Sequence, residues 1–293
     1  MNLNSILYED NHLIAINKKS SEIVQGDRTG DRTMPDTIKS YLKEKYNKPG
    51  NVFCGVIHRL DRPTSGVILF ARTSKGLERM NKQFRDKETT KTYWAILENK
   101  PPQDEGTLSN YVKKNEKQNK SYVTSMDTKG AKKAILHYRL LSSSERYHLV
   151  EVKLETGRHH QIRTQFSKIG CCIKGDLKYG ARRSNTDGSI CLHSRKIAFN
   201  HPTTKKPIII VAPLPENTFW KLFKSISERS TEINIEKYKV PHAQSVNFFP
   251  CNALRGSRIH QTLLGHHKLL RIVSWHQEPM DNYHPSQHKS LLQ

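Results

Sequence analysis

The sequence predicts an α+β fold with a mostly antiparallel, mixed central sheet flanked by helices. Segments with strand-like patterns outnumber segments with helical patterns along the chain. Residues 134–141 and 147–154 alternate apolar and polar side chains on both sides of a short polar turn, which is typical of antiparallel neighbours. Strands that follow one another without a helix between them argue against a doubly wound parallel sheet.

The chain opens with two short apolar runs, at 5–8 and 13–17, around the turn-like residues 9–11. These runs predict a β-hairpin or two edge strands. Residues 20–35 are polar, contain glycine and proline, and predict a loop. Helical spacing of apolar residues then predicts a helix over 34–46.

The next elements alternate between strand and helix. Residues 66–71 (GVILFA) form a continuous apolar run, which predicts a buried strand. Ser74 is the expected N-cap of the following helix, which carries an apolar stripe at helical spacing. Aromatic and β-branched residues at 92–97 (TYWAIL) predict another strand.

Residues 99–133 are rich in lysine and asparagine and are expected to form a basic, loop-rich insertion, interrupted by the strand-like segment 121–126. Two interpretations of its lysines stay open: they bind phosphate groups, or they belong to a solvated loop. The lysines concerned are Lys113, Lys114, Lys117, Lys120, Lys132 and Lys133.

The remaining pattern predicts three further features. Apolar residues at helical spacing follow Gly157 and predict a helix over 158–169. Residues 194–199 and 207–211 flank a polar turn and predict a hairpin. A final helix is expected at 219–226.

Charge and composition narrow the class of protein. Lysine and arginine total 49 against 27 acidic residues, a formal net charge of +22, which favours a polyanionic partner such as nucleic acid. No run of 18 apolar residues and no signal-peptide pattern occurs, so we expect a cytoplasmic protein without a membrane span. The five cysteines form no CxxC pair, which predicts neither a disulfide framework nor a zinc site.

The composition changes near Asn234. Residues 234–293 hold seven of the fifteen histidines, four prolines and only three acidic residues. We therefore expect one catalytic domain over 1–230. A basic, histidine-rich extension over 231–293 is either disordered or a small accessory element.

The segment 58–66 (HRLDRPTSG) carries the sharpest chemical signal. Asp61 is flanked by Arg59 and Arg62, and a carboxylate held beside cations stays ionised, as a nucleophile should. The alternative is an aspartate-capped turn whose charges lie in solvent. A kinase catalytic loop is excluded because the sequence has no glycine-rich loop and no DFG.

An ordered set of motifs resembles the RluA-type pseudouridine synthases over about residues 5–225. Residues 58–66 match their HRLD-x-x-T-S-G motif. Further matches are K-x-Y-x-A at 91–95, E-T-G-R-x-H-Q-I-R at 155–163, the glycine-rich segment 170–180, L-H at 192–193, H-P-x-T at 201–204 and A-P-L-P at 212–215. The resemblance implies the pseudouridine synthase catalytic fold, in the single-domain form without an S4 RNA-binding domain. One departure is that Lys18-Lys19-Ser20-Ser21 stands where the family has K-P-x-G.

The resemblance also implies the reaction and three catalytic residues. Such enzymes detach uracil from C1′, rotate it and rejoin it through C5, with no cofactor and no metal. Asp61 would attack C1′ or assist loss of the base, a choice that the sequence leaves open. Tyr93 would stack on the uracil and handle a proton, and Arg163 would pair with Asp61.

Substrate-binding residues follow from the same motifs. Arg59 matches the arginine that fills the space of the extruded base, and His58, Arg62, Thr64 and Arg158 complete the expected substrate-binding set. His58, His159 and His160 are candidate ligands or catalysts, but hydrogen bonding within the fold is favoured because no carboxylate cluster or metal-ligand spacing accompanies them.

The expected partner is RNA, either rRNA or tRNA, and the chain is expected to act as a monomer without an obligatory protein partner. One alternative is a catalytically idle RNA-binding or RNA-folding protein on the same scaffold. Another is a glycosidase-like hydrolase, but no motif supplies the second carboxylate that it would need.

Overall fold

The structure is a computed structural model that describes residues 5–26 and 30–226. The predicted extension over 231–293 lies outside these residues. The strands are β1 (Ile6–Glu9), β2 (Leu13–Lys18), β3 (Gly55–Val56), β4 (Ser65–Ala71), β5 (Thr90–Leu97), β6 (Glu105–Asn115), β7 (Lys120–Thr124), β8 (Lys132–Ser143), β9 (His148–Leu154), β10 (Leu192–Asn200) and β11 (Pro207–Val211). The helices are α1 (Met34–Lys45), α2 (Ser74–Arg85), α3 (Gln161–Lys168), the 3₁₀ turn η2 (Leu177–Tyr179) and α4 (Thr218–Lys221).

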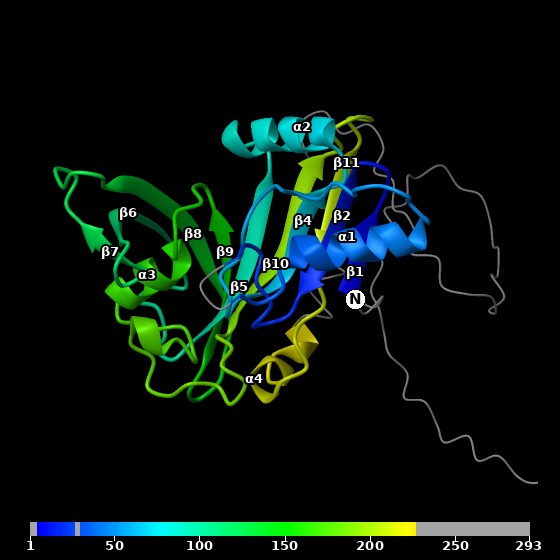
Figure 1. Cartoon of the computed structure of the whole chain (residues 1–293). Coiled ribbons are helices and arrows are strands. Elements are labelled where there is room, and N and C mark those ends of the chain that lie inside the picture. Colours follow the sequence, from blue (N-terminus) through cyan, green and yellow to red (C-terminus); the bar gives the residue numbers. More distant parts are fainter. Residues whose placement is uncertain (1–4, 27–29, 227–293) are drawn as a thin grey trace, which may run out of the picture.

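One mixed, mostly antiparallel sheet joins these strands, so the predicted fold class is confirmed. Its order is β1-β2-β4-β10-β5-β9-β8-β6-β7, with β11 paired to β10 and β3 paired to β4. The pairing of β4 with β10 is parallel, and the other pairings in the described sheet are antiparallel. Figure 1 shows the long helices around this curved sheet.

Helices cover both faces of the sheet because successive strand residues point to opposite sides. Ile14 of β2 lies in a core cluster that includes Ile38 of α1 and Phe166 of α3. Its neighbour Leu13 lies in a second cluster, on the opposite face, which includes Met80 of α2. The site described below lies on the face that α1 and α3 share.

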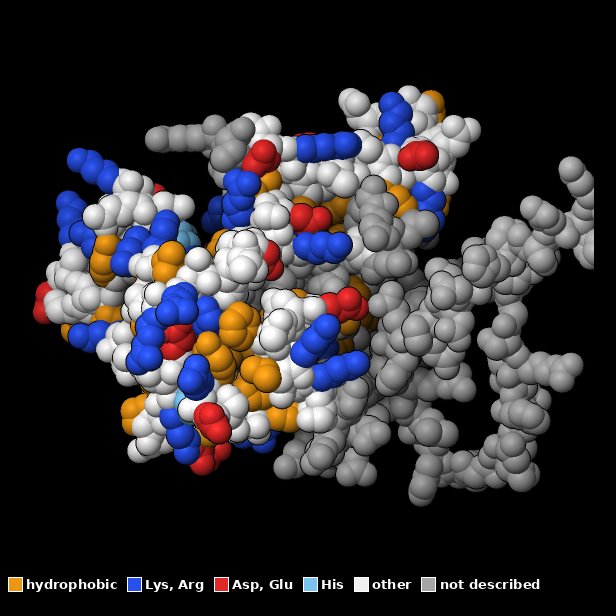
Figure 2. All heavy atoms as spheres, turned by 90° about the horizontal axis from the view of Figure 1, so that it is seen from below, with side chains coloured by type: hydrophobic (Ala, Val, Ile, Leu, Met, Phe, Trp, Pro, Cys, Tyr) orange, Lys and Arg blue, Asp and Glu red, His pale blue; other side chains and the backbone are white. Residues whose placement is uncertain are grey.

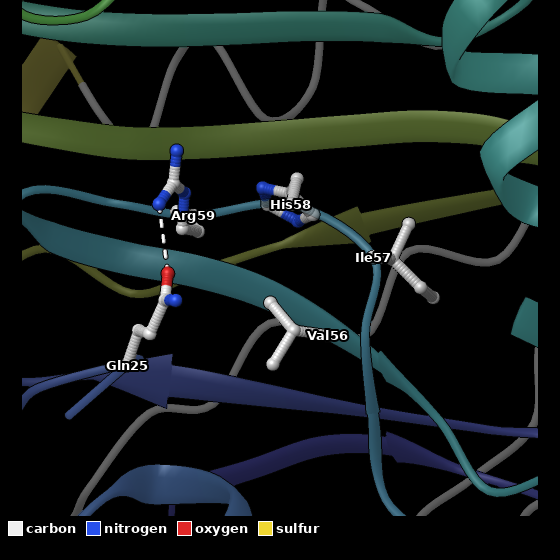
Figure 3. A pocket seen from close by; sticks show the side chains of 5 residues that line it. All are labelled: Gln25, Val56, Ile57, His58 and Arg59. Atoms are coloured by element: carbon white, nitrogen blue, oxygen red, sulfur yellow. Dashed lines mark hydrogen bonds between the residues drawn. The ribbon is translucent and has the colours of Figure 1, made fainter.

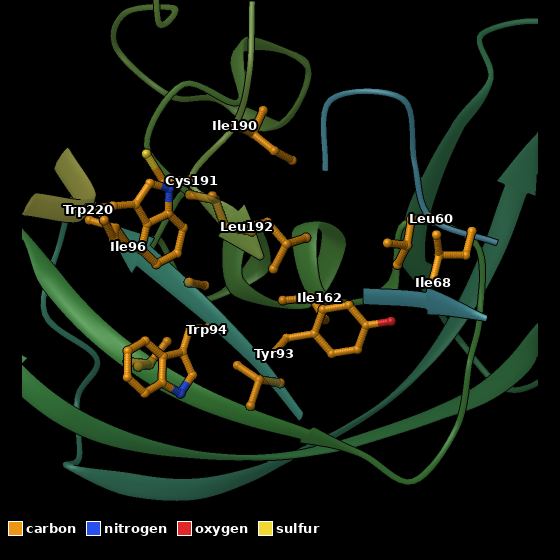
Figure 4. Packing of buried hydrophobic residues seen from close by; sticks show 14 of the residues in the cluster. Leu60, Ile68, Tyr93, Trp94, Ile96, Ile162, Ile190, Cys191, Leu192 and Trp220 are labelled. Atoms are coloured by element: carbon orange, nitrogen blue, oxygen red, sulfur yellow. The ribbon is translucent and has the colours of Figure 1, made fainter. Parts of the chain in front are cut away.

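The first core cluster extends beneath the Asp61 turn. Figure 4 shows the ring of Tyr93 from β5 among the side chains of Leu60, Ile68 and Ile162, with its hydroxyl on the side of Leu60 and Ile68. Apolar packing therefore holds the Tyr93 ring in place beside the Asp61 turn.

The expected loop-rich insertion at 99–133 was wrong in one respect, because β6 is an eleven-residue strand within it. β6 pairs with both β7 and β8. In its first half, exposed residues such as Thr107 and Ser109 alternate with less exposed ones such as Leu108. A strand with one face in solvent tolerates many polar residues, which hid it among the lysines.

Three helix boundaries also differ from the predictions. Thr73, rather than Ser74, caps α2 by accepting from the Gly76 N–H at 3.1 Å. α3 begins at Gln161 instead of 158, because His160 adopts a left-handed backbone that cannot continue a helix. The expected final helix at 219–226 is interrupted: α4 ends at Lys221, residues 222–223 form a turn, and residues 224–226 are helical again.

Candidate active site

Asp61 lies in a tight turn that leads directly into β4. The Thr64 N–H donates to the Asp61 carbonyl oxygen at 3.0 Å and closes the turn. Gly66 follows with φ +112°, and a Cβ there would lie 2.3 Å from the Ser194 carbonyl oxygen of β10. Only glycine fits this approach, so the residues after Asp61 fix the turn against a central strand of the sheet.

Lys18, at the end of β2, supports the same turn from below. It is 1% exposed, and its Nζ donates to the carbonyl oxygens of Lys19, Arg62 and Thr64 at 3.0, 3.0 and 2.8 Å. The Ser21 N–H donates to the Arg62 carbonyl oxygen at 3.0 Å. The end of the first hairpin therefore holds both sides of the Asp61 turn. The sequence pattern did not indicate this role, since a lysine at a strand end is usually solvated.

Arg163 of α3 joins two carboxylates. Its Nε and Nη2 donate to Asp176 at 2.7 and 2.8 Å, and its Nη1 donates to Asp61 Oδ2 at 3.0 Å. Burial alone would lower the pKa of Arg163, but the two carboxylates outweigh it and raise the pKa, so the guanidinium stays charged. Asp176 is 1% exposed and was missed as a site residue, although it lies in the glycine-rich motif at 170–180.

Two histidines lie beside this pair. His160 Nε2 lies 3.6 Å from Asp61 Oδ2, and His160 Nδ1 lies 2.9 Å from the Tyr179 hydroxyl. The His159 ring stacks on the His160 ring with centroids 3.7 Å apart. Among the described residues, the side chains that contact the Asp61 carboxylate are Arg163 and His160, and both contact Oδ2.

Tyr93 completes the group. Its side chain is buried, and burial followed by the negative charge of Asp61 raises the pKa of its hydroxyl. The phenol is therefore neutral at physiological pH. The structure thus brings together Asp61, Tyr93 and Arg163 from a turn, a strand and a helix.

Arg59 lines a pocket of about 380 Å³. Its Nη1 donates to Gln25 Oε1 at 2.7 Å, and Val56, Ile57 and His58 complete the lining (Figure 3). The pocket combines an apolar wall with an amide and a guanidinium beside the Asp61 turn.

His58 is held within the fold. Its Nε2 accepts from the Leu69 N–H of β4 at 3.0 Å, and its ring stacks on Phe84 of α2 with centroids 5.2 Å apart. Burial lowers the pKa of His58 to about 3, so the ring is neutral. The ring lies on the α2 side of β4, and the structure does not bring it to Asp61.

The other expected substrate-binding residues differ in exposure. Arg62 forms an exposed ion pair with Asp31 at 2.8 Å. The Arg158 Nε donates to the Lys133 carbonyl oxygen at 2.9 Å at the surface. Thr64 is 2% exposed, and its hydroxyl has no hydrogen-bond partner among the described residues.

Most of the insertion lysines are exposed on the β6–β7–β8 part of the sheet, and Lys120 is half-buried. Figure 2 shows lysine and arginine side chains gathered over the side of the molecule that holds these strands and α3. Five of these six lysines therefore lie on strands of the sheet, and Lys117 lies on the turn between β6 and β7.

Among the described residues, no group of three or more histidine, cysteine, aspartate or glutamate side chains is placed to hold a metal ion. No helix in residues 5–26 or 30–226 has the length and hydropathy of a membrane span.

The fold and this site define the class of pseudouridine synthases. The structure matches human RNA pseudouridylate synthase domain containing 4 with a TM-score of 0.63 and 24% identity, over 76% of this chain and 93% of that one. A structural match at 24% identity shows a shared fold only. The family is shown by the sequence relatives.

Residues 12–168 match the RNA pseudouridylate synthase family model. Ribosomal large subunit pseudouridine synthase C of Rickettsia prowazekii is 34% identical over 212 residues, covering 72% of this chain and 68% of the relative. tRNA pseudouridine synthase C of Pectobacterium carotovorum is 31% identical over 228 residues, covering 71% and 58%. The chain belongs to the RluA-type family of RNA pseudouridine synthases, which are isomerases that act on RNA.

Proposed function

We propose that this enzyme converts a uridine of rRNA or tRNA to pseudouridine, with Asp61 as the catalytic carboxylate. The observation that carries the proposal is the one-sided binding of that carboxylate. Arg163 and His160 both approach Oδ2, whereas Oδ1 has no partner among the described residues. Oδ1 is therefore the oxygen available to the substrate.

The chemistry suits one ionised carboxylate. The C1′–N1 bond of uridine breaks, the base rotates, and a C1′–C5 bond forms. The C5 proton is lost and N1 gains a proton, so the composition of the RNA is unchanged. Positive charge develops at C1′ as the first bond weakens, and Asp61 stabilises or captures it. The charged Arg163 holds Asp61 in a fixed orientation.

The neighbouring residues take the supporting roles. The Tyr93 ring packs against the uracil, and its neutral hydroxyl relays the C5 proton to water by accepting it while giving up its own proton. Arg59 occupies the space that the extruded base leaves, and the exposed Arg62 and Arg158 bind nearby phosphates. His58 and Thr64 were expected to bind substrate, and we assign them instead to holding the Asp61 turn.

The substrate class rests on the relatives. One is named for the large ribosomal subunit and one for tRNA, so both RNA classes are the substrates to test. The excess of lysine and arginine supports binding of either polyanion.

Tritium release from transcripts labelled at uridine C5 tests the proposal, because pseudouridine formation must expel that hydrogen. We expect release by the wild type and a loss of more than about 100-fold in Asp61→Asn. Asp104→Asn is the matched control, since its carboxylate forms an exposed ion pair with Lys100.

The other outcomes separate the alternatives. Release by Asp61→Asn at the wild-type rate would remove Asp61 from the mechanism. Tight RNA binding without release from any rRNA or tRNA would favour the idle RNA-binding protein. Free uracil in place of pseudouridine would identify a hydrolase.

A further inference from the structure

We infer that His160 is a positioning residue for Asp61, and that Tyr179 fixes its tautomer so that the Nε2–H faces the carboxylate. The inference deepens the proposed function and rests on the catalytic role of Asp61. It assigns a role to a histidine whose motif position alone indicated only hydrogen bonding within the fold.

The backbone of His160 is the first observation. His160 occupies the N-cap position of α3 with φ 51° and ψ 26°, and its side chain makes no capping hydrogen bond. N-caps are ordinarily serine, threonine, aspartate or asparagine with an extended backbone. A left-handed conformation is unfavourable for a residue with a Cβ. Two local preferences are broken at one residue beside the site, which points to a functional constraint on its side chain.

Tyr179 supplies the second observation. The Ser121 N–H donates to the Tyr179 hydroxyl oxygen at 2.8 Å, so that oxygen already serves as an acceptor. The hydroxyl proton is then available to His160 Nδ1, 2.9 Å away. A neutral imidazole whose Nδ1 accepts carries its proton on Nε2. The hydrogen-bond chain from the β7 backbone therefore sets the tautomer.

The contact between His160 Nε2 and Asp61 requires the same tautomer. His160 Nε2 faces Asp61 Oδ2 at 3.6 Å, and an ionised carboxylate only accepts hydrogen bonds. The separation exceeds a hydrogen bond, as is common in sites that tighten when substrate binds. Arg163, three residues further along α3, donates to the same oxygen at 3.0 Å. The N-cap and the first turn of α3 therefore direct two donors toward Oδ2.

The surroundings keep the ring neutral. Burial first, and then positive neighbours with Arg163 foremost among them, together lower the pKa of His160 to about 2. The charged groups that face it are Asp61 on the turn before β4, Arg163 on α3, Lys178 on η2 and Lys114 on β6. His160 is therefore a fixed neutral donor rather than a proton shuttle.

Nitrogen NMR of the full chain labelled with ¹⁵N-histidine tests the tautomer without reference to activity. The His160 signals are identified by their loss in His160→Gln. We expect the Nε2–H tautomer, unchanged between about pH 6 and pH 8, and a mixture of tautomers in Tyr179→Phe. An Nδ1–H tautomer or an imidazolium in the wild type would overturn the inference.

Two matched variants test the positioning role. Glutamine places an amide donor near the position of Nε2, whereas asparagine suits the left-handed backbone but is too short to reach Asp61. We expect His160→Asn to lower kcat about 10-fold with KM unchanged, and His160→Gln to retain most of kcat. Melting temperatures of both variants check that they fold.

The outcomes are distinct from a failure of the proposed function. Equal kcat values for the two variants, whether both normal or both reduced, would overturn the donor role of His160. If Asp61→Asn remains fully active, the proposed function fails, and the inferred positioning role fails with it even where NMR finds the expected tautomer.

Discussion

Ser21 has φ 73°, in the left-handed region that favours glycine. The RluA-type motif K-P-x-G has glycine at this position. We expect Ser21→Gly to raise the free energy of unfolding by about 1 kcal/mol, because it relieves a strained backbone next to the Asp61 turn. Urea denaturation measures the change.

Ser20→Gly is the control for that prediction, since Ser20 has no left-handed backbone. A glycine there only adds freedom to the unfolded chain and should not stabilise the protein. Equal effects of the two substitutions would contradict the interpretation.

Lys18 gives a pH-dependent prediction. Burial lowers its pKa from 10.5 to about 8. Between these pH values the unfolded chain holds a proton that the folded chain has released, so the Lys18 contribution to the free energy of unfolding rises with pH. From about pH 7.5 to pH 10.5, the wild type should gain about 3 kcal/mol relative to Lys18→Met.

Urea unfolding at the two pH values tests the Lys18 prediction, with Lys19→Met as the exposed neighbouring control. A difference between wild type and Lys18→Met that stays constant across the window would show that Lys18 keeps an ordinary pKa in the folded protein.

Residues in short motifs were the predictable part of the site. Asp61, Tyr93 and Arg163 each lie in a motif whose sequence is distinctive, and they meet in the structure. The contacts of Lys18 and Asp176 were not predictable, because their partners lie 46 and 13 residues away and no local pattern records such pairs.

At the scale of elements, prediction followed the strength of the periodic signal. The alternating strands β8 and β9 and the apolar β4 were predicted with boundaries within a few residues. β6 was not, because half of it faces solvent and its lysines resemble a loop composition. A helix start was misplaced where a left-handed residue overrides helical spacing, at His160.

The sheet position of the insertion lysines leads to a prediction about RNA binding. Lys113, Lys117 and Lys132 are exposed on β6, on the turn after it and on β8. If each contacts one phosphate, changing all three to alanine should reduce the slope of log Kd against log salt concentration by about 2. Filter binding at several salt concentrations measures the slope.

Lys75→Ala is the matched control for charge, because Lys75 is exposed on α2, which packs on the other face of the sheet. It should leave the slope unchanged. A slope that is the same for the triple variant and the wild type would assign these lysines to a solvated surface.

At the scale of the whole molecule, we predict that residues beyond 230 are dispensable for chemistry. Trp220 and Phe223 are buried in the main core cluster, and a chain ending at about residue 230 retains both. The truncated chain should release tritium within about twofold of the full-length rate, since no group proposed for catalysis is removed. A truncated chain that folds but loses turnover would contradict this.

The position of β10 has a consequence for how the protein is made. β10 lies between β4 and β5 in the sheet, yet only β11 follows it among the described strands. Roughly 120 residues separate β4 from its neighbour β10 along the chain. A ribosome adds about 5–20 residues per second, so β10 emerges roughly ten seconds after β4.

During that interval of roughly ten seconds, β4 and β5 each present an edge of unpaired N–H and C=O groups, of the kind that invites pairing with another chain. Gly66 and Ser194, which meet closely across β4 and β10, come together only after the nascent chain has passed residue 194. Newly synthesised molecules are therefore open to aggregation and to chaperone binding until a late strand closes the sheet.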